Sequence, residues 1–294
     1  MSHPNIVRHD TEKYYYDPKT ESQKGNFPFN DSSERSVDLS IIVPAYNEEL
    51  RLPVMLDETI EFLEKRSASL KSYSYEIIVI DDGSKDKTTE VAQEYTKKYG
   101  ANKVRVLTLF RNKGKGGAVR MGILSSRGKY LLMADADAAT RFSDIVKLEA
   151  KIKEIEKDSI NGMAIAVGSR AHLEEDSIAN RSLFRTILMK GFHLLVWFLC
   201  VRTVRDTQCG FKLFNRKAAF TTFLNLHVER WAFDAELLYI AESLNIPIAE
   251  VAVYWTEIDG SKMVPVLSWI QMGWDLLLIY IWHMTRMWTI EKME

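Results

Sequence analysis

Two aspartates one residue apart are the first groups in the chain whose spacing suggests chemistry. Asp135 and Asp137 flank an alanine at the end of the apolar run 129–135. In an extended segment, residues two apart point to the same side, so both carboxylates face one spot. Hard oxygen ligands of this kind suit Mg²⁺ or Mn²⁺, which usually also bind a substrate's phosphates. Exposed acidic pairs are common, and it is the position after a buried strand that favours a metal site here.

Three other segments combine polar groups with turn residues. VPAYNEE (43–49) and DDGS (81–84) each follow an apolar run, although each alone also fits an ordinary turn with capping residues. RNKGKGGA (111–118) is basic and glycine-rich at a predicted helix start, where backbone N–H groups attract anions. It does not match the P-loop of ATPases, and no G-x-G-x-x-G fingerprint follows the first strand. An ATPase of that type and an NAD-dependent dehydrogenase are therefore disfavoured.

These segments lie between apolar runs that alternate with helical stretches. The predicted strands cover 40–44, 76–81, 104–110, 129–135 and 163–169, and the predicted helices cover 50–66, 86–98, 116–126 and 143–157. Strands that are joined by helices and buried on both faces indicate a doubly wound, mostly parallel sheet of the α/β class. Ligands of such sheets bind at the carboxyl ends of the strands, which is where the polar segments stand.

The bulk composition limits the possible functions. The chain has 294 residues, 39 basic and 40 acidic side chains, and a formal charge of -1. Binding of nucleic acid through an overall excess of positive charge is therefore not expected. The two cysteines have neither the paired spacing of a zinc site nor the density of a disulfide scaffold, which suits a reducing compartment.

The two ends of the chain differ from its centre. Residues 1–38 are polar and predict a flexible arm without a signal peptide or an N-terminal anchor, and 39–262 form the predicted catalytic domain. The apolar stretch 187–201 is too short to span a bilayer. In the stretch 264–288, polar residues interrupt the sequence, so neither stretch is interpreted as a membrane span. Residues 263–294 are instead predicted to form an amphipathic helix with a polar stripe of Ser268, Gln271, Asp275, His283 and Arg286.

In this order, VPAYNE, DDGS, NKGKGGA and DAD resemble the motifs of family 2 glycosyltransferases with the GT-A fold. Four downstream motifs extend the resemblance, namely GSRAH (168–172), RDTQCGFKLF (205–214), ERWAFDAELLYIA (229–241) and WTEIDGSK (255–262). They are similar to members that transfer glucose from UDP-glucose to dolichyl phosphate. The resemblance covers about 39–288 and implies a role in lipid-linked oligosaccharide assembly and protein N-glycosylation.

The resemblance also implies roles for residues that hold the nucleotide. Asp135 and Asp137 are similar to the pair that holds the ribose and the metal-bound diphosphate, with Asp137 nearest the metal. Carboxylates in the nucleotide cradle can accept hydrogen bonds from uracil N–H and ribose hydroxyl groups. The expected cradle consists of Pro44, Tyr46, Glu48, and Asp81 or Asp82.

The implied roles of the cations and of one further acid concern the reacting groups. Lys113 and Lys115 are expected near the diphosphate or the sugar without a ranking between them, and Lys262 is expected to close over the phosphates. Arg170 resembles the arginine that meets the acceptor phosphate, a task suited to its planar fork of donors. Asp234, at a probable helix start, resembles an acid that faces the sugar, although acids at that position also simply complement the helix dipole. Surface solubility is the alternative for each cation.

The implied reaction is an in-line attack by an already ionised phosphate on C1 of glucose, which inverts its configuration. A polyprenol acceptor requires the enzyme to meet a membrane, so the sequence predicts a peripheral protein on the cytosolic face of the endoplasmic reticulum. Homodimerisation is possible. Two alternatives remain open, namely transfer of mannose from GDP-mannose and a catalytically silent regulator that binds nucleotide sugars.

Overall fold

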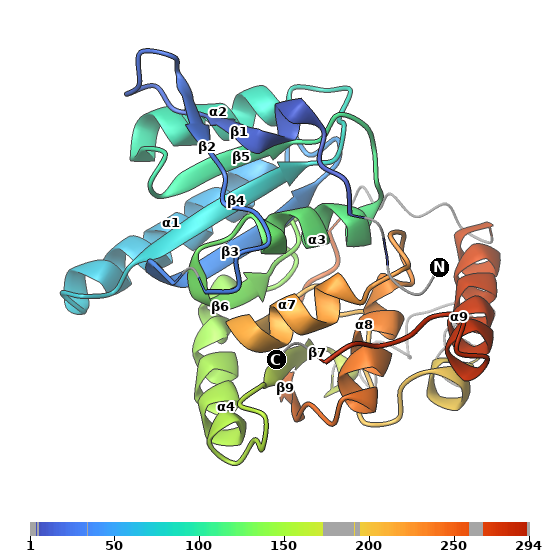
Figure 1. The fold of residues 1–294 in the computed structure, drawn as a ribbon. Helices are drawn as coiled ribbons and strands as arrows, with labels where there is room; N and C mark the ends of the chain where they lie inside the picture. The colour runs from blue at the N-terminus through green and yellow to red at the C-terminus, as the bar shows by residue number, and fades with distance from the viewer. Residues whose placement is uncertain are drawn as a thin grey trace.

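A seven-stranded, mostly parallel sheet forms the centre of the computed structural model, which describes residues 4, 6–33, 35–172, 191, 195–258 and 267–292 (Figure 1). The strand order is β5-β4-β3-β6-β8-β7-β9. The strands are β3 (Val37–Ala45), β4 (Tyr75–Asp81), β5 (Val104–Thr108), β6 (Gly128–Met133), β7 (Ile165–Ser169), β8 (Lys212–Asn215) and β9 (Ile248–Ala252).

Helices connect most of the strands and cover both faces of the sheet. They are α1 (Leu52–Ser69), α2 (Thr88–Tyr99), α3 (Lys115–Leu124), α4 (Ile145–Lys157), α7 (Arg216–Leu224), α8 (Phe233–Ser243) and α9 (Leu267–Met284), with a short 3-10 helix η2 (Phe142–Asp144) before α4. The five predicted strands and four predicted helices are confirmed to within a few residues at their ends. The predicted α/β class with a mostly parallel sheet is therefore confirmed.

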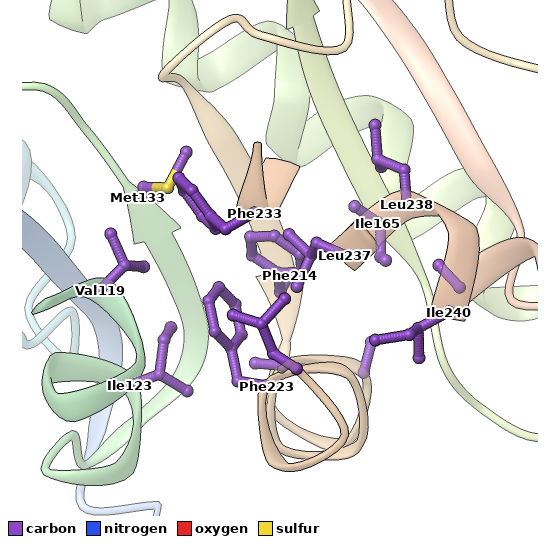
Figure 2. Close-up of a cluster of buried hydrophobic side chains, with 14 of the residues drawn as sticks. Val119, Ile123, Met133, Ile165, Phe214, Phe223, Phe233, Leu237, Leu238 and Ile240 are labelled. Atoms are coloured by element: carbon purple, nitrogen blue, oxygen red, sulfur yellow. The ribbon is translucent and has the colours of Figure 1, made fainter. Parts of the chain in front are cut away.

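Strand alternation divides the core between the two faces. Ile41 and Val43 of β3 pack with residues of α1 and α4, whereas Ile42 packs with residues of α3, α7 and α8. Figure 2 shows part of the cluster that contains Ile42, in which Phe214 of β8 lies among apolar side chains of α3, α7 and α8. Because the centre of β3 is buried on both faces, its residues 41–45 form a continuous apolar run.

One strand runs against the others. β8 pairs antiparallel with both β6 and β7, so it joins the first four strands to the last two. The sequence analysis did not predict β8 or β9. Their segments are only four and five residues long, which leaves little periodicity for a sequence pattern to show.

Part of the predicted arm has structure of its own. It contains the 3-10 helix η1 (Asp10–Lys13) and a hairpin of β1 (Tyr14–Tyr16) and β2 (Lys24–Asn26), next to β5 in Figure 1. Glu12 is buried and accepts hydrogen bonds from the backbone N of Phe110 (3.1 Å) and from Lys113 Nζ (3.2 Å). Both η1 and β1 therefore pack against β5 and the segment that follows it.

The C-terminal helix ends earlier than predicted. α9 ends at Met284, so Arg286 of the predicted polar stripe lies beyond it, and His283 is buried against α8. Trp274, Ile281 and Met284 are exposed on the helix. Among the described residues, no helix combines the length and apolar character needed to cross a membrane.

Candidate active site

The predicted site residues follow strands that are neighbours in the sheet. β4, β3 and β6 are parallel, and Ala45 pairs with Asp81 in their register. Because parallel strands end at the same edge, the segments after these three strands meet there. Asp135 and Asp137 follow β6 at this edge.

The loops after β3 and β4 bind each other. The backbone N of Asn47 donates to Ser84 Oγ (2.9 Å), and Asn47 Oδ1 accepts from the backbone N of Lys85 (2.8 Å). Asn47 has a φ of 54°, in the left-handed region that asparagine tolerates better than most residues. Pro44 and Tyr46 stand beside this turn and are half-buried.

Glu48 is held in place before α1. Its Oε2 accepts from Arg51 Nε at 2.7 Å, and its Oε1 lies 2.5 Å from a terminal nitrogen of the same guanidinium. Glu48 stabilises the charge of Arg51, so that its pKa is raised although burial opposes this. The carboxylates of Asp135 and Asp137 also act on Arg51, which puts the turn after β3 within electrostatic range of both.

The paired aspartates after β4 have different partners. Asp81 accepts hydrogen bonds from Ser84 N (2.9 Å) and from the hydroxyl of Thr89. Asp82 accepts from the backbone N of Lys113 (2.7 Å) and of Gly114 (2.9 Å), so it fixes the basic turn to the end of β4. Burial raises the pKa of Asp82 to about 6, because the low-dielectric surroundings disfavour its charged form.

The two lysines of the basic turn point to different places. Lys113 Nζ lies 3.2 Å from Glu12 of the arm. Lys115, at the first turn of α3, lies 2.7 Å from Asp135 Oδ1. Burial opposes the charge of Lys115, but Asp135, Asp234 and Asp137 outweigh it and raise its pKa. Lys115 is thus the lysine of this turn that the structure directs at the acidic pair.

The acidic pair has the chemistry of a divalent cation site. Asp137 Oδ1 accepts from the backbone N of Ala139 at 3.0 Å, and its other oxygen has no partner among the described residues. A Cβ on Gly210 would lie 2.0 Å from Asp135 Oδ2, so only glycine fits against this carboxylate. Although burial opposes it, Lys115, Lys212 and Arg170 hold the pKa of Asp135 below its usual value. Two carboxylate ligands one residue apart therefore fit Mg²⁺ or Mn²⁺.

Asp234 lies behind this pair, in the first turn of α8, so the predicted helix start is confirmed. Its Oδ1 lies 2.5 Å from Lys212 Nζ, and both side chains are almost completely buried. Lys212 also donates to the backbone oxygen of Cys209 at 2.6 Å. Burial raises the pKa of Asp234, and the attraction of Lys212 and Lys115 offsets this only in part.

Arg170 follows β7 and is clamped by one carboxylate. Its Nε and a terminal nitrogen donate to the two oxygens of Asp206 at 2.7 and 2.8 Å, and its guanidinium stands over the ring of Trp255 at 5.3 Å. Although burial opposes it, Asp206 raises the pKa of Arg170. Arg170 also lowers the pKa of Asp135 electrostatically, so the arginine lies within electrostatic range of the acidic pair at the end of β6.

Comparison with known proteins identifies the family of the chain. The model of the family described as "Glycosyl transferase family 2" matches residues 40–221. The chain belongs to this family. Its fold is the GT-A fold of solved glycosyltransferases.

Curated relatives of this family 2 glycosyltransferase cover almost the whole chain. A human protein named dolichyl-phosphate beta-glucosyltransferase is 59% identical over 290 residues, which are 98% of this chain and 88% of the human protein. The Saccharomyces cerevisiae protein of the same name is 43% identical over 254 residues, 84% of this chain and 75% of the yeast protein.

Solved structures are similar in fold at low sequence identity. Mannosyl-3-phosphoglycerate synthase from Rubrobacter xylanophilus has a TM-score of 0.57 at 15% identity, over 85% of this chain and 75% of that one. Glucosyl-3-phosphoglycerate synthase from Mycobacterium tuberculosis, in complex with Mn²⁺, UDP-glucose and phosphoglyceric acid, has a TM-score of 0.53 at 16% identity, over 85% and 80%.

Sequence reasoning did not assign roles to several residues of this site. Lys212, Gly210 and Asp206 all lie within the motif RDTQCGFKLF, which the sequence analysis recognised without assigning roles inside it. Arg51 was missed because an arginine at the start of a helix has no distinctive pattern. Lys262, predicted to close over the phosphates, lies outside the described residues.

Proposed function

We propose that the protein transfers glucose from UDP-glucose to the phosphate of dolichyl phosphate and inverts the configuration at C1. The main support is the name shared by relatives at 43% to 59% identity over most of the chain. The site agrees with it, because cations and carboxylates converge at one sheet edge, as a donor diphosphate and an acceptor phosphate require.

The proposed roles follow from the contacts of each residue. The turns after β3 and β4 hold the uridine through the predicted cradle. Lys115 supplies a positive charge next to Asp135 for the diphosphate. Arg170 is oriented by Asp206 to meet the acceptor phosphate, and Asp234 balances the buried charge of Lys212. In this arrangement the enzyme positions two charged substrates, and the ionised acceptor needs no strong base.

Asp135 and Asp137 are the proposed ligands of Mg²⁺ or Mn²⁺. A divalent cation at this place supplies positive charge for the departing UDP. Asp137 contributes one carboxylate oxygen, and the backbone of Ala139 orients the carboxylate through the other. Gly210 allows the Asp135 carboxylate to pack directly against the backbone, which fixes the position of this ligand.

Contact with a membrane is part of the proposal, because dolichyl phosphate is embedded in one. Exposed apolar side chains support it on two segments, α9 with Trp274 (61% exposed) and the helical residues 195–199 with Trp197 (52%) and Phe198 (64%). Tryptophan concentrates at membrane interfaces. We propose a peripheral attachment at the cytosolic face of the endoplasmic reticulum.

The decisive experiment supplies two donors to the purified protein. With dolichyl phosphate and Mn²⁺ or Mg²⁺, UDP-glucose should give dolichyl glucosyl phosphate, and GDP-mannose should give at least about a hundredfold less product. A preference for GDP-mannose would identify a mannosyltransferase. Binding of UDP-glucose without turnover would identify a silent regulator, and either result would contradict the proposal.

A further inference from the structure

A second group of metal-binding side chains lies away from the acidic pair, between α8 and α9. One nitrogen each of His227 and His283 and one carboxylate oxygen of Glu236 all lie within 4.8 Å of one another. His227 Nδ1 is 3.0 Å from Glu236 Oε1, and His283 Nε2 is 3.4 Å from the same oxygen. We propose that these three residues bind Zn²⁺ and thereby fasten α9 to the catalytic domain.

The spacing of the three groups fits this metal. Zinc bonds of about 2.0 to 2.1 Å in a tetrahedron put neighbouring ligand atoms about 3.3 Å apart. The two separations from Glu236 Oε1, 3.0 and 3.4 Å, lie close to that value, and the two imidazole nitrogens lie within 4.8 Å of each other, so zinc binding draws them together. Imidazole nitrogens favour Zn²⁺ over Mg²⁺, which prefers oxygen ligands and water. Water occupies the fourth position in the proposed site.

The surroundings of Glu236 also call for a positive charge. The side chain is fully buried, and its Oε2 accepts from the backbone N of His227 (3.0 Å) and of Val228 (2.6 Å). Its Oε1 therefore faces the two imidazoles. The guanidinium of Arg120 also acts on Glu236, but it is already paired with Glu229. A proton on an imidazole or a metal ion must balance the carboxylate, and three converging ligands favour the metal.

Aromatic rings enclose the group. The ring of Trp288 stacks on His227 with centroids 4.2 Å apart, and Tyr239 packs against His283 at 4.7 Å. These ring contacts hold the two imidazoles in a single orientation. His283 belongs to the last turn of α9, whereas Glu236 follows Asp234 in α8 by two residues. The proposed zinc thus connects the helix with the exposed tryptophan to the helix that borders the active site.

Metal content tests the proposal without any substrate. The full-length protein is incubated with one equivalent of Zn²⁺ and dialysed against excess Mg²⁺, which occupies the acidic pair. The zinc content per chain is then measured by inductively coupled plasma mass spectrometry. We expect about one zinc per chain, and a Tm that falls after chelation and recovers with Zn²⁺ but not with Mg²⁺ or Mn²⁺. Less than about one zinc per ten chains, or a Tm that Zn²⁺ leaves unchanged, overturns the proposal.

Variants separate this site from the acidic pair. His283→Gln keeps an N–H group for Glu236 but replaces the imidazole ligand, so it should weaken Zn²⁺ affinity about tenfold or more. Asp137→Ala and the control His9→Gln, whose exposed histidine stacks on Phe110, should retain the zinc. Wild-type zinc affinity in folded His283→Gln, or loss of zinc in Asp137→Ala, would contradict the assignment.

Discussion

At the scale of single residues, opposite charges alternate through the active site. Lys115 lies against Asp135, Lys212 against Asp234, and Arg170 against Asp206. Each cation is held by a carboxylate before any substrate arrives, so binding needs little reorganisation of the side chains. Removing one partner of such a pair leaves the other buried and uncompensated, which costs more than the pair itself contributes.

Replacing Asp137 should affect turnover without affecting the stability of the fold. Asp137→Ala should lower turnover by at least about a thousandfold, because a proposed metal ligand is lost. It should leave Tm within about 2 °C of wild type, since a half-exposed side chain leaves no core cavity. Turnover and thermal unfolding are measured together, with exposed Asp158→Ala as control. Near-normal turnover in the folded variant would exclude the metal role.

Arg170 allows the two substrates to be distinguished. Arg170→Lys retains a charge but loses the two-point contact with Asp206, so KM for dolichyl phosphate should rise about tenfold or more. The Kd of UDP, measured calorimetrically, should change less than about twofold. Asp206→Asn should produce the same pattern by misorienting the arginine. An equal loss of affinity for dolichyl phosphate and for UDP would contradict the assignment of Arg170 to the acceptor phosphate.

Asp82 makes stability depend on pH. Its pKa is about 6 in the folded protein and about 3.9 in an unfolded chain, so folding favours the protonated form. This contribution is complete below about pH 4 and is lost as the pH rises through 6, a change on the order of 3 kcal/mol.

The comparison variant is Asp82→Asn, which cannot ionise. The free energy of unfolding of wild type minus that of Asp82→Asn, from denaturant titrations, should fall between pH 4 and pH 7. A difference that does not vary with pH would show that Asp82 has an ordinary pKa in the folded protein.

At the scale of secondary-structure elements, α9 buries one side and exposes another. Met272, Leu276 and Ile279 are buried in the core, whereas Trp274 and Ile281 are exposed. An exposed tryptophan on a helix with this composition suits an interface between water and lipid.

Trp274→Glu combined with Ile281→Glu should release the protein from liposomes by placing charge on the side of α9 that is proposed to face lipid. Flotation should leave at least about 80% of wild type with the vesicles and less than about 20% of the double variant. The control Ile160→Glu alters a fully exposed residue in the loop after α4 and should float like wild type. If the double variant still floats but gel filtration shows loss of a dimer, the surface joins subunits instead.

Sequence patterns predicted some elements better than others for physical reasons. β3 and β4 are buried on both faces, so their apolar runs are unambiguous. The amphipathic interpretation of α9 grouped His283 with the other polar residues of the helix and did not predict its burial, because the sequence does not show which residue it contacts. That partner, Glu236, comes from a different helix and is close only in the folded chain.

At the scale of the whole molecule, the same distinction applies to the site. Asp135, Asp137 and the turns after β3 and β4 were predictable, because a parallel sheet brings strand ends together. The partners Lys212 and Asp206 were not, since they enter through β8 and the segment before it. The hydrophobic pattern of a short strand does not show that it is inserted antiparallel between parallel strands.

The position of β8 has a consequence for how the protein is synthesised. Within the described sheet, β7 pairs only with β8 and β9, which leave the ribosome later. β5, β4, β3 and β6 can therefore assemble on the nascent chain while β7 still has two unpaired edges, which are prone to aggregation. Proteolysis of stalled nascent chains should find 37–133 protected first. Protection of 165–169 should follow only after residue 252 has emerged, so the last third of translation decides whether a finished chain folds or aggregates.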